Sequence, residues 1–229
     1  MQIVMTPELL LEAYRQGLFP MAYSADSPYM HWICPEMRGQ ISIPHMHISR
    51  SLERTVRKNK NRGESYQIKV DTAFSQVIKS CAERRENRPE TWINQPIIDV
   101  FIDLHKKGHA HSIEYWEGAQ LKGGLYGLVI GGAFFGESMF SRTPNASKIV
   151  MVHLVARLWA GGFTVFDTQF VNEHLKQFGV YELPHKEYMG RLGQAIHLDV
   201  DFKQSGKTEA ELVAVYLEIR ASGGVSHPE

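Results

Sequence analysis

Apolar residues along the chain recur with the spacing of helices in some segments and with that of strands in others. Over residues 74–81 an apolar residue recurs every third or fourth position, which predicts an amphipathic helix. Residues 109–139 are rich in β-branched and aromatic residues and are interrupted by glycine turns at 117–118 and 131–132. This pattern predicts three consecutive strands in an antiparallel meander.

Residues that favour helix termini mark the ends of several predicted helices. Thr6 is a good N-cap, Pro7 suits the first helical position and Gly17 suits the position after the end, so a short helix is predicted between them. Thr208 and Glu211 have the spacing of a capping box and predict the start of a C-terminal helix. The remaining predicted helices cover 49–60, 96–107 and 147–160, and the remaining short strands cover 40–44, 66–70 and 163–167.

The order of these elements predicts an α+β fold with a mostly antiparallel sheet flanked by helices, because helices precede and follow an uninterrupted meander. Residues 19–37 combine prolines with aromatic residues and predict an irregular but folded loop. We place a domain boundary after this loop, which gives a small N-terminal domain, 1–37, and a larger domain, 38–229. The last residues, 222–229, are predicted to be frayed.

Composition and charge narrow the class of protein. Of the 229 residues 43% are hydrophobic, which is typical of a globular chain with a full core. Lys and Arg number 25, as do Asp and Glu, so the net charge is zero and a polyanionic partner has to meet a local basic face. The two cysteines fit no disulfide framework and no metal site, and no apolar stretch is long enough to span a bilayer. These features predict a cytoplasmic protein.

The predicted helix at 49–60 carries a one-sided basic stripe. Arg50, Arg54, Arg57 and Lys58 share a helical face, with Glu53 as the one acid. In a chain of zero net charge, such a stripe is typical of a surface that binds a phosphate backbone. An ordinary solvated helix explains the charge pattern equally well.

Two acidic residues lie next to uncharged strands. Glu137 ends one of them, and Asp167 ends another with Gln169 two positions later. Residues two apart in an extended chain point to the same side, so Asp167 and Gln169 can offer a proton acceptor and an amide donor to one reacting group. An aspartate at a strand end that caps the next helix is the competing interpretation.

The glycine-rich stretch 123–132 does not carry a nucleotide-binding fingerprint. It lacks the G-x-G-x-x-G order at a strand-to-helix turn, and no G-K-[ST] follows. Glycines in adjacent strands are more typical of β-bulges or of close backbone approach.

Several strings resemble the bacterial leucyl/phenylalanyl-tRNA–protein transferases, in that family's order and over about residues 6 to 203. The most specific is GESMFSR at 136–142, followed by NASK at 145–148. The other strings are AYRQGLFP at 13–20, HISRS at 47–51, TWI at 91–93, GHAHSIE at 108–114 and DTQ at 167–169.

This resemblance implies a small N-terminal α/β domain and a larger domain of the acetyltransferase-like (GNAT) fold. It implies transfer of Leu, Phe or sometimes Met from aminoacyl-tRNA to the N-terminal Arg or Lys of a protein, which then enters N-degron proteolysis. No metal and no cofactor are expected, and we expect a monomer.

The resemblance also implies roles for particular residues. It supports Asp167, Gln169 and Glu137 as site residues. We expect Asp167 to accept or relay the amine proton or to orient the amine, Gln169 to hydrogen-bond the amine or the carbonyl, and Glu137 to hold the cationic acceptor or to anchor the terminal adenosine. Trp92 and Tyr14 match positions that stack on the terminal adenine, and the basic stripe at 50–58 gains the tRNA acceptor stem as its partner. The family's amino-acid pocket is matched by Leu125, Met139, Met151, Leu154 and Phe166.

The main rival is a GNAT-fold N-acetyltransferase that uses acetyl-CoA. Such an enzyme needs a glycine-rich pyrophosphate loop of the type Q/R-x-x-G-x-G/A before a helix. The segment that opens the helix at 147–160 reads RTPNASK and has no glycine, which disfavours this rival. A non-catalytic module that binds the tRNA end is the second rival, and the retained acidic residues disfavour it.

Overall fold

The structure is a computed structural model of the 229-residue chain, and it describes residues 5–61, 65–84, 89–204 and 206–222. The predicted frayed tail lies outside these residues, apart from Ser222. Within the described part, none of the helices is both long enough and apolar enough to cross a membrane.

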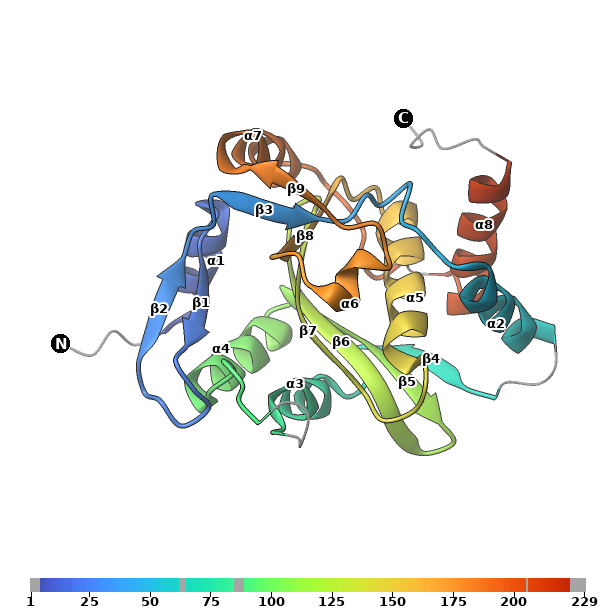
Figure 1. Ribbon diagram of the computed structural model, residues 1–229, viewed down its shortest axis with the longest axis horizontal. Helices are drawn as coiled ribbons and strands as arrows, with labels where there is room; N and C mark the ends of the chain where they lie inside the picture. Colours follow the sequence, from blue (N-terminus) through green and yellow to red (C-terminus); the bar gives the residue numbers. More distant parts are fainter. Residues whose placement is uncertain (1–4, 62–64, 85–88, 205, 223–229) are drawn as a thin grey trace.

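A seven-stranded sheet runs through the molecule in the order β4-β5-β6-β7-β8-β3-β9 (Figure 1). All neighbouring strands are antiparallel except β7 and β8, so the sheet is mixed but mostly antiparallel, as predicted. The strands are β3 (Met37–Gln40), β4 (Gln67–Val70), β5 (Ala110–Glu117), β6 (Gln120–Ile130), β7 (Ala133–Ser141), β8 (Val165–Gln169) and β9 (Tyr181–Pro184).

Helices cover both faces of the sheet. The predicted helices near 6–17, 49–60, 74–81, 96–107 and 147–160 are confirmed, and so is the C-terminal one. The helices are α1 (Pro7–Arg15), α2 (Arg50–Asn61), α3 (Phe74–Ala82), α4 (Gln95–Lys106), α5 (Ala146–Ala160), α6 (Glu173–Lys176), α7 (His185–Ala195) and α8 (Glu209–Ala221).

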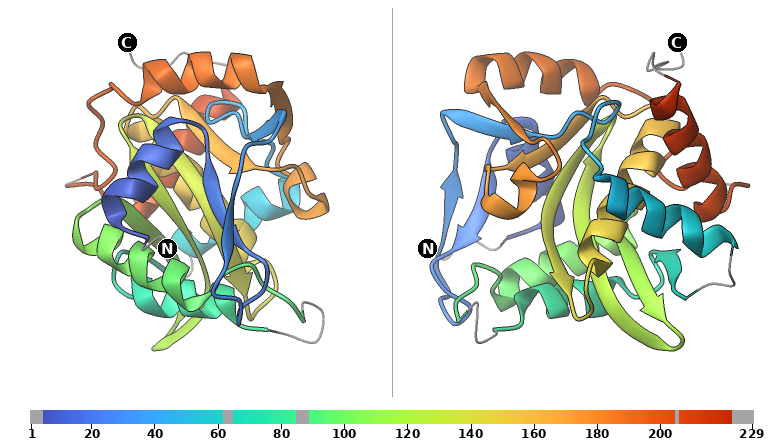
Figure 2. Two further views of the ribbon diagram at one scale, coloured as in Figure 1. Left: turned by 90° about the vertical axis from the view of Figure 1, so that its left-hand side faces the viewer. Right: turned by 45° about the vertical axis from the view of Figure 1, so that its right-hand side comes forward.

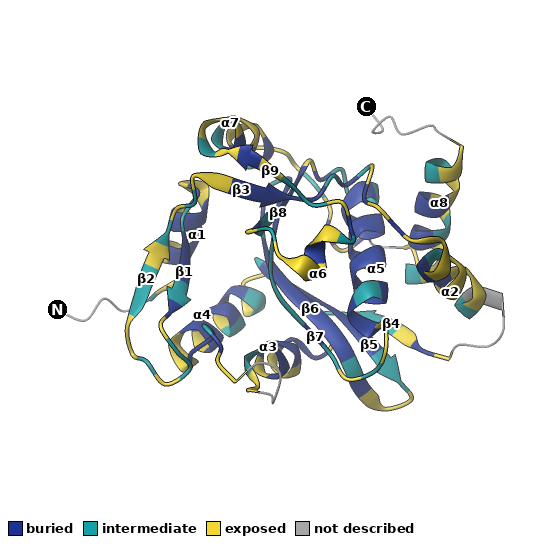
Figure 3. Ribbon diagram, viewed as in Figure 1, coloured by how far each residue is buried: buried dark blue, intermediate teal, exposed yellow. Residues whose placement is uncertain are grey.

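Helix α5 is the centre of one core and connects the two parallel strands. Parallel neighbours require a crossover connection, and α5 supplies it between β7 and β8. One face of α5 packs on the sheet, and α8 and α2 lie against the rest of it (Figure 2). Because it is covered on all sides, α5 is buried along almost its whole length (Figure 3). On the other face of the sheet, α1, α3 and α4 enclose a second core.

The capping signals act as predicted. The Thr6 side chain accepts a hydrogen bond from the Leu9 amide at the start of α1. At the start of α8 the Glu211 amide donates to the Thr208 hydroxyl, and the Glu211 carboxylate accepts from the Thr208 amide at 2.7 Å. These bonds satisfy backbone groups that the helices leave unpaired.

The prediction of an irregular loop over 19–37 is wrong for much of that segment. It contains a two-stranded hairpin, β1 (Phe19–Ala22) and β2 (Met30–Ile33), and the start of β3. Each strand is four residues long, and the proline at position 20 lowers the strand signal, although a two-stranded ribbon tolerates proline at its edge. The strand predicted over 40–44 lies earlier in the chain, because β3 ends at Gln40. Strand β9 was not predicted, because only one of its four residues is buried and the segment shows no alternation.

Two bulges shape the strands at the centre of the sheet. Tyr126 pairs with Ser138 while Gly127 pairs with Gly136, so Glu137 is an extra residue in β7. A Cβ atom at position 127 would lie 2.4 Å from the Phe134 ring, so only glycine fits opposite this bulge. In the same way Gly39 pairs with Gln169 and Gln40 with Asp167, which leaves Thr168 as the extra residue in β8.

Candidate active site

A pocket of about 710 Å³ opens beside the two bulges. Its walls come from β6, β7, β8, α5 and α6 and from Trp92, which precedes α4. The lining residues are Trp92, Leu125, Gly136, Glu137, Ser138, Met139, Phe140, Ser141, Ser147, Met151, Phe166, Thr168, Gln169, Asn172, Glu173, His174 and Leu175. The pocket therefore combines apolar side chains with a polar wall, as small-molecule sites commonly do.

Four of the five predicted amino-acid-pocket residues line this pocket. Leu125 projects from β6, Met139 from β7, Met151 from α5 and Phe166 from β8. The fifth, Leu154, is fully buried in the core around α5 and does not line the pocket. Four of the predicted residues, from four elements, thus converge on one cavity.

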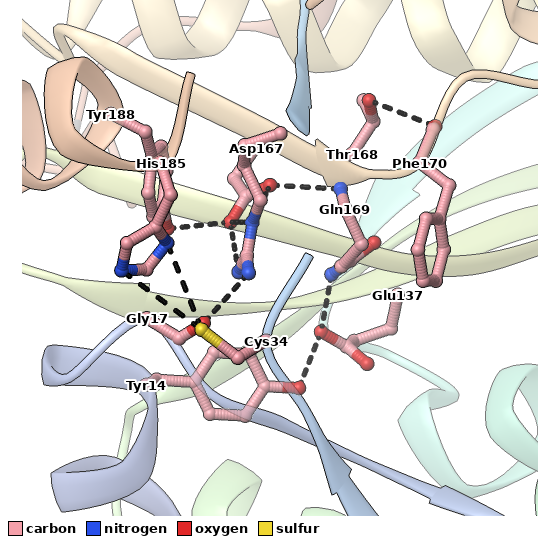
Figure 4. Close-up of polar contacts among 11 residues, drawn as sticks. Tyr14, Gly17, Cys34, Glu137, Asp167, Thr168, Gln169, Phe170, His185 and Tyr188 are labelled. Atoms are coloured by element: carbon pink, nitrogen blue, oxygen red, sulfur yellow. Dashed lines mark hydrogen bonds and ion pairs between the residues drawn. The ribbon is translucent and has the colours of Figure 1, made fainter. Parts of the chain in front are cut away.

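Glu137 forms the polar wall together with Gln169. The Tyr14 hydroxyl donates a hydrogen bond of 2.7 Å to Oε1 of Glu137, and Nε2 of Gln169 donates one of 3.1 Å to the same oxygen (Figure 4). Both bonds end on Oε1, so Oε2 is the oxygen that remains for a ligand. The bulge re-aims this side chain away from the regular alternation of β7, which is a common use of bulges next to active sites.

Burial raises the pKa of Glu137 to about 8, and the negative charge of Asp167 acts in the same direction. The hydrogen bonds from Tyr14 and Gln169 and the charge of Arg38 oppose this rise, because they favour the ionised carboxylate. Glu137 is therefore a carboxyl group that changes its protonation state near neutral pH.

Asp167 has a different environment and does not line the pocket. It is fully buried, and the Arg38 guanidinium donates to both of its oxygens, with the shortest contact at 2.7 Å from Nη2. The Tyr188 hydroxyl donates to Oδ2 at 2.7 Å and the Gln169 amide donates to Oδ1 at 2.8 Å. Both carboxylate oxygens are thus occupied by three partner residues, Arg38, Tyr188 and Gln169.

Arg38 is held as firmly as Asp167. Its side chain is fully buried, lies over the Phe19 and Tyr188 rings at 4.8 and 4.6 Å, and donates to the Gly17 carbonyl at 2.7 Å. The charge of Asp167 raises the pKa of Arg38, against the effect of burial. Arg38 therefore ties the end of α1 to the end of β8.

Gln169 connects the two carboxylates. Its φ angle is +58°, a left-handed conformation that non-glycine residues rarely adopt. The bond from its amide to Asp167 holds this conformation, and its side chain then reaches Glu137. Figure 4 shows Asp167 and Gln169 next to each other, with Glu137 facing Gln169. The sequence predicted that Asp167 and Gln169 point to the same side. In the structure Gln169 lines the pocket, whereas Asp167 lies behind it and holds the Gln169 backbone.

The two predicted adenine-stacking residues differ in accessibility. Trp92 is partly buried and lines the pocket. Tyr14 is fully buried and packs edge-on against Phe135, with ring centroids 5.0 Å apart. It has no exposed face for stacking, and its contribution to the site is the hydroxyl group bound to Glu137.

The basic stripe lies on a separate surface. Arg50, Arg54, Arg57 and Lys58 line a shallow hollow on α2 together with Glu53. Arg57 donates to Glu53 at 2.8 Å and to the Leu217 carbonyl at 3.2 Å. In Figures 1 and 2, α2 and α6 lie on opposite sides of α5. The predicted phosphate-binding face and the pocket are thus neighbours across one helix.

Sequence reasoning missed Arg38 and Tyr188. Arg38 pairs with a residue 129 positions away, and neither residue belongs to a periodic or charged pattern that predicts such a contact. In the described part of the chain, no three His, Cys, Asp or Glu side chains come together in a way that suits a metal ion.

Comparison with known proteins gives one consistent family. The family model described as leucyl/phenylalanyl-tRNA protein transferase matches residues 40–193, and the model of that family's N-terminal domain matches residues 4–36. A protein of Paramagnetospirillum magneticum named leucyl/phenylalanyl-tRNA–protein transferase is 47% identical over 92% of this chain and 99% of its own length. A protein of the same name from Phenylobacterium zucineum is 49% identical over 86% of this chain and 87% of its own length. Another, from Hyphomonas neptunium, is 45% identical over 96% of this chain and 83% of its own length.

Proposed function

The chain belongs to the leucyl/phenylalanyl-tRNA protein transferase family, and we propose that the pocket beside Glu137 carries out its reaction. The enzyme is an aminoacyltransferase that moves leucine or phenylalanine from aminoacyl-tRNA to the N-terminal Arg or Lys of a protein. The observation that carries the assignment of the site is a single cavity in which an apolar slot borders a carboxylate with a raised pKa.

The apolar part of the pocket suits the side chain of the donor amino acid. Leu125, Met139, Met151 and Phe166 surround it. Unbranched, polarizable methionine side chains adjust to ligands of different shape, so one slot can accept both a branched aliphatic and an aromatic side chain. The same property extends to a methionyl donor.

The reaction is the aminolysis of an ester. The neutral α-amine of the acceptor attacks the carbonyl carbon of the aminoacyl ester, a C–N bond forms, and the bond from carbon to the ribose oxygen breaks. The proton that the amine loses ends on the ribose oxygen that leaves. Positioning and proton transfer are therefore the main tasks of the site.

Glu137 is suited to the proton transfer. A general base is most effective when its pKa lies near the working pH, and an α-amine has a pKa of about 8 as well. Oε2 of Glu137, which neither Tyr14 nor Gln169 contacts, accepts the proton from the attacking amine and returns it to the leaving ribose oxygen.

Gln169 and Asp167 support this step in different ways. The Gln169 amide group donates to Glu137 through Nε2, which leaves Oε1 to accept a hydrogen bond from the acceptor amine. Asp167 accepts hydrogen bonds from Arg38, Tyr188 and the backbone N–H of Gln169. It is therefore a positioning residue, which holds Gln169 in its left-handed conformation.

The wider surface is assigned to the tRNA. Trp92 in the pocket wall offers a ring for the terminal adenine. Arg50, Arg54, Arg57 and Lys58 on α2 offer charge to the phosphates of the acceptor stem, without base readout. This proposal also includes four expectations from the sequence: an acetyltransferase-like arrangement, a domain boundary after residue 37, a monomeric state and entry of the product into N-degron proteolysis.

Narrowing the slot tests its assignment. Met139 lines the pocket and is only partly buried, so Met139→Trp is expected to fill space in the pocket. We expect kcat/KM for phenylalanyl-tRNA to fall at least about tenfold and that for leucyl-tRNA to fall less, because the larger donor side chain loses more room. The assay is transfer of radiolabelled Leu or Phe to a peptide that begins with Arg.

The matched control is Val215→Trp on α8, where the side chain is exposed and does not line the pocket. This variant is expected to match the wild type with both donors. If Met139→Trp also transfers both amino acids with unchanged kcat/KM, the donor slot lies elsewhere.

A further inference from the structure

The charges that line the pocket have one sign. Among the lining residues that the structure describes, the carboxylates are Glu137 and Glu173, and there is no lysine or arginine. His174 also lines the pocket, and burial together with the nearby charge of Lys148 lowers its pKa, so it is neutral at pH 7. The pocket therefore offers two carboxylates to a cationic ligand, and they differ in position.

Glu137 is poorly placed to bind the side chain of the acceptor. Oε1 is occupied by Tyr14 and Gln169, and the raised pKa keeps much of the carboxyl group neutral at pH 7. In the proposed reaction its other oxygen faces the α-amine. The cationic end of an Arg or Lys side chain is a chain of methylene groups away from that amine, so it needs a second anionic partner.

Glu173 is that partner by position. It is the first residue of α6, and the cap of this helix is made by Asn172, whose Oδ1 accepts from the Leu175 amide at 2.9 Å. Glu173 is therefore not needed as a cap, and its side chain is 88% exposed. Leu175 is buried beneath it and fixes α6 against the core.

The present partner of Glu173 is easily exchanged. Lys176, one turn further along α6, donates to Oε1 of Glu173 at 2.5 Å, and both side chains are mostly exposed. Exposed pairs of this kind contribute little free energy, so an incoming guanidinium or ammonium group can replace Lys176. A guanidinium can bind the carboxylate through two parallel hydrogen bonds, which an ammonium group cannot do.

We propose that Glu173, at the rim of the pocket, binds the cationic side chain of the N-terminal Arg or Lys of the acceptor protein and so sets the preference for basic N termini. This assignment rests on the proposed function and deepens it, because it gives acceptor specificity to a residue outside the proton-transfer machinery. The arrangement also favours an N-terminal Arg over Lys.

Peptide kinetics with Glu173→Gln test the assignment. We expect KM for a peptide that begins with Arg to rise about threefold to fivefold, the range that an exposed ion pair contributes, with kcat and the KM for phenylalanyl-tRNA within about twofold of the wild type. The ratio of kcat/KM between Arg and Lys peptides is expected to fall. Glu173→Lys is expected to gain measurable transfer to peptides that begin with Asp or Glu, because the rim charge is reversed.

Two further variants define the contact. Glu187→Gln on α7 removes another exposed carboxylate that is paired with a cation one turn away, at 2.9 Å from Arg191, and it is expected to leave all constants unchanged. Lys176→Gln removes the competing cation and is expected to lower KM for the Arg peptide a few-fold.

The outcomes separate this inference from the function. Transfer by the wild type to Arg peptides, with an unchanged KM in Glu173→Gln, overturns the inference and leaves the function in place. A rise in KM at constant kcat in Glu137→Gln, but not in Glu173→Gln, assigns the cation to Glu137 and also overturns it. Absence of transfer by the wild type to any basic peptide removes the proposed function, and the inference with it.

Discussion

Two carboxyl groups lie close together in this protein and have opposite environments: Asp167 is fully buried, and Glu137 is partly buried at the pocket wall. Asp167 faces a fully buried guanidinium and also accepts hydrogen bonds from the Tyr188 hydroxyl and the Gln169 backbone amide. Glu137 has only neutral hydrogen-bond donors as direct partners, and burial raises its pKa to about 8. The difference shows that burial alone does not make a carboxylate reactive. A group becomes suited to proton transfer where no cation compensates for the lost water.

The first prediction concerns the ion pair between Asp167 and Arg38, whose disruption is expected to have the largest effect. Arg38→Met leaves the Asp167 carboxylate buried without its cation, so we expect the free energy of unfolding to fall by about 3–5 kcal/mol. Urea denaturation at pH 7 measures the change. The double variant Arg38→Met with Asp167→Asn removes both charges and is expected to lose less than Arg38→Met alone. A loss below about 1 kcal/mol in the single variant would show that the pair does not hold this region together.

Glu137→Gln tests the reactive side of the comparison. The amide has nearly the same shape but cannot accept the proton, so we expect kcat at pH 7 to fall about a hundredfold or more. In the wild type, the rate rises with pH because both Glu137 and the acceptor amine must lose a proton, and each does so near pH 8.

The pH profile separates the two carboxylates. Below pH 7 the slope of log kcat/KM against pH is expected to be about 2 in the wild type and about 1 in Glu137→Gln, where only the amine titrates. A wild-type profile in Glu137→Gln together with a lost limb in Asp167→Asn would return the proton transfer to Asp167.

Tyr14→Phe gives the smallest and sharpest effect. The Tyr14 hydroxyl stabilises the ionised form of Glu137, so its removal raises the pKa of Glu137 further. If the rise is about one unit, the ionised fraction at pH 7 falls about tenfold, and kcat/KM falls with it. Because the defect is one of protonation, activity is expected to recover at a pH above the new pKa. A defect of equal size at pH 7 and pH 9.5 would mean that the hydroxyl acts through geometry instead.

The sequence predicted the elements whose signal is local. Helix α3 has an apolar stripe, α8 has a capping box, and β5, β6 and β7 are separated by glycine turns. The sequence did not predict the hairpin of β1 and β2 or the strand β9, because a four-residue strand has too few alternating positions to be distinguished from a loop.

The site was predictable in its members more than in its geometry. Glu137, Gln169 and Trp92 line the pocket, and the family strings pointed to all three. Their arrangement depends on the bulge at Glu137 and on the left-handed backbone at Gln169, and local pattern does not encode either feature. The role of Arg38 could not be predicted, because a single arginine in the sequence does not indicate a partner 129 positions away.

The place of β3 in the sheet has a consequence for the chain as it leaves the ribosome. Both neighbours of β3, the strands β8 and β9, are synthesised more than a hundred residues later, and Arg38 and Asp167 are 129 positions apart. While most of the polypeptide emerges, β3 has no strand to pair with and Arg38 has no counter-ion. The meander of β5, β6 and β7 pairs strands that follow one another directly in the chain, so it can form first. The Arg38–Asp167 contact and the pocket beside Glu137 are therefore completed late in biogenesis, and we expect no activity from a nascent chain that lacks residues 165–169.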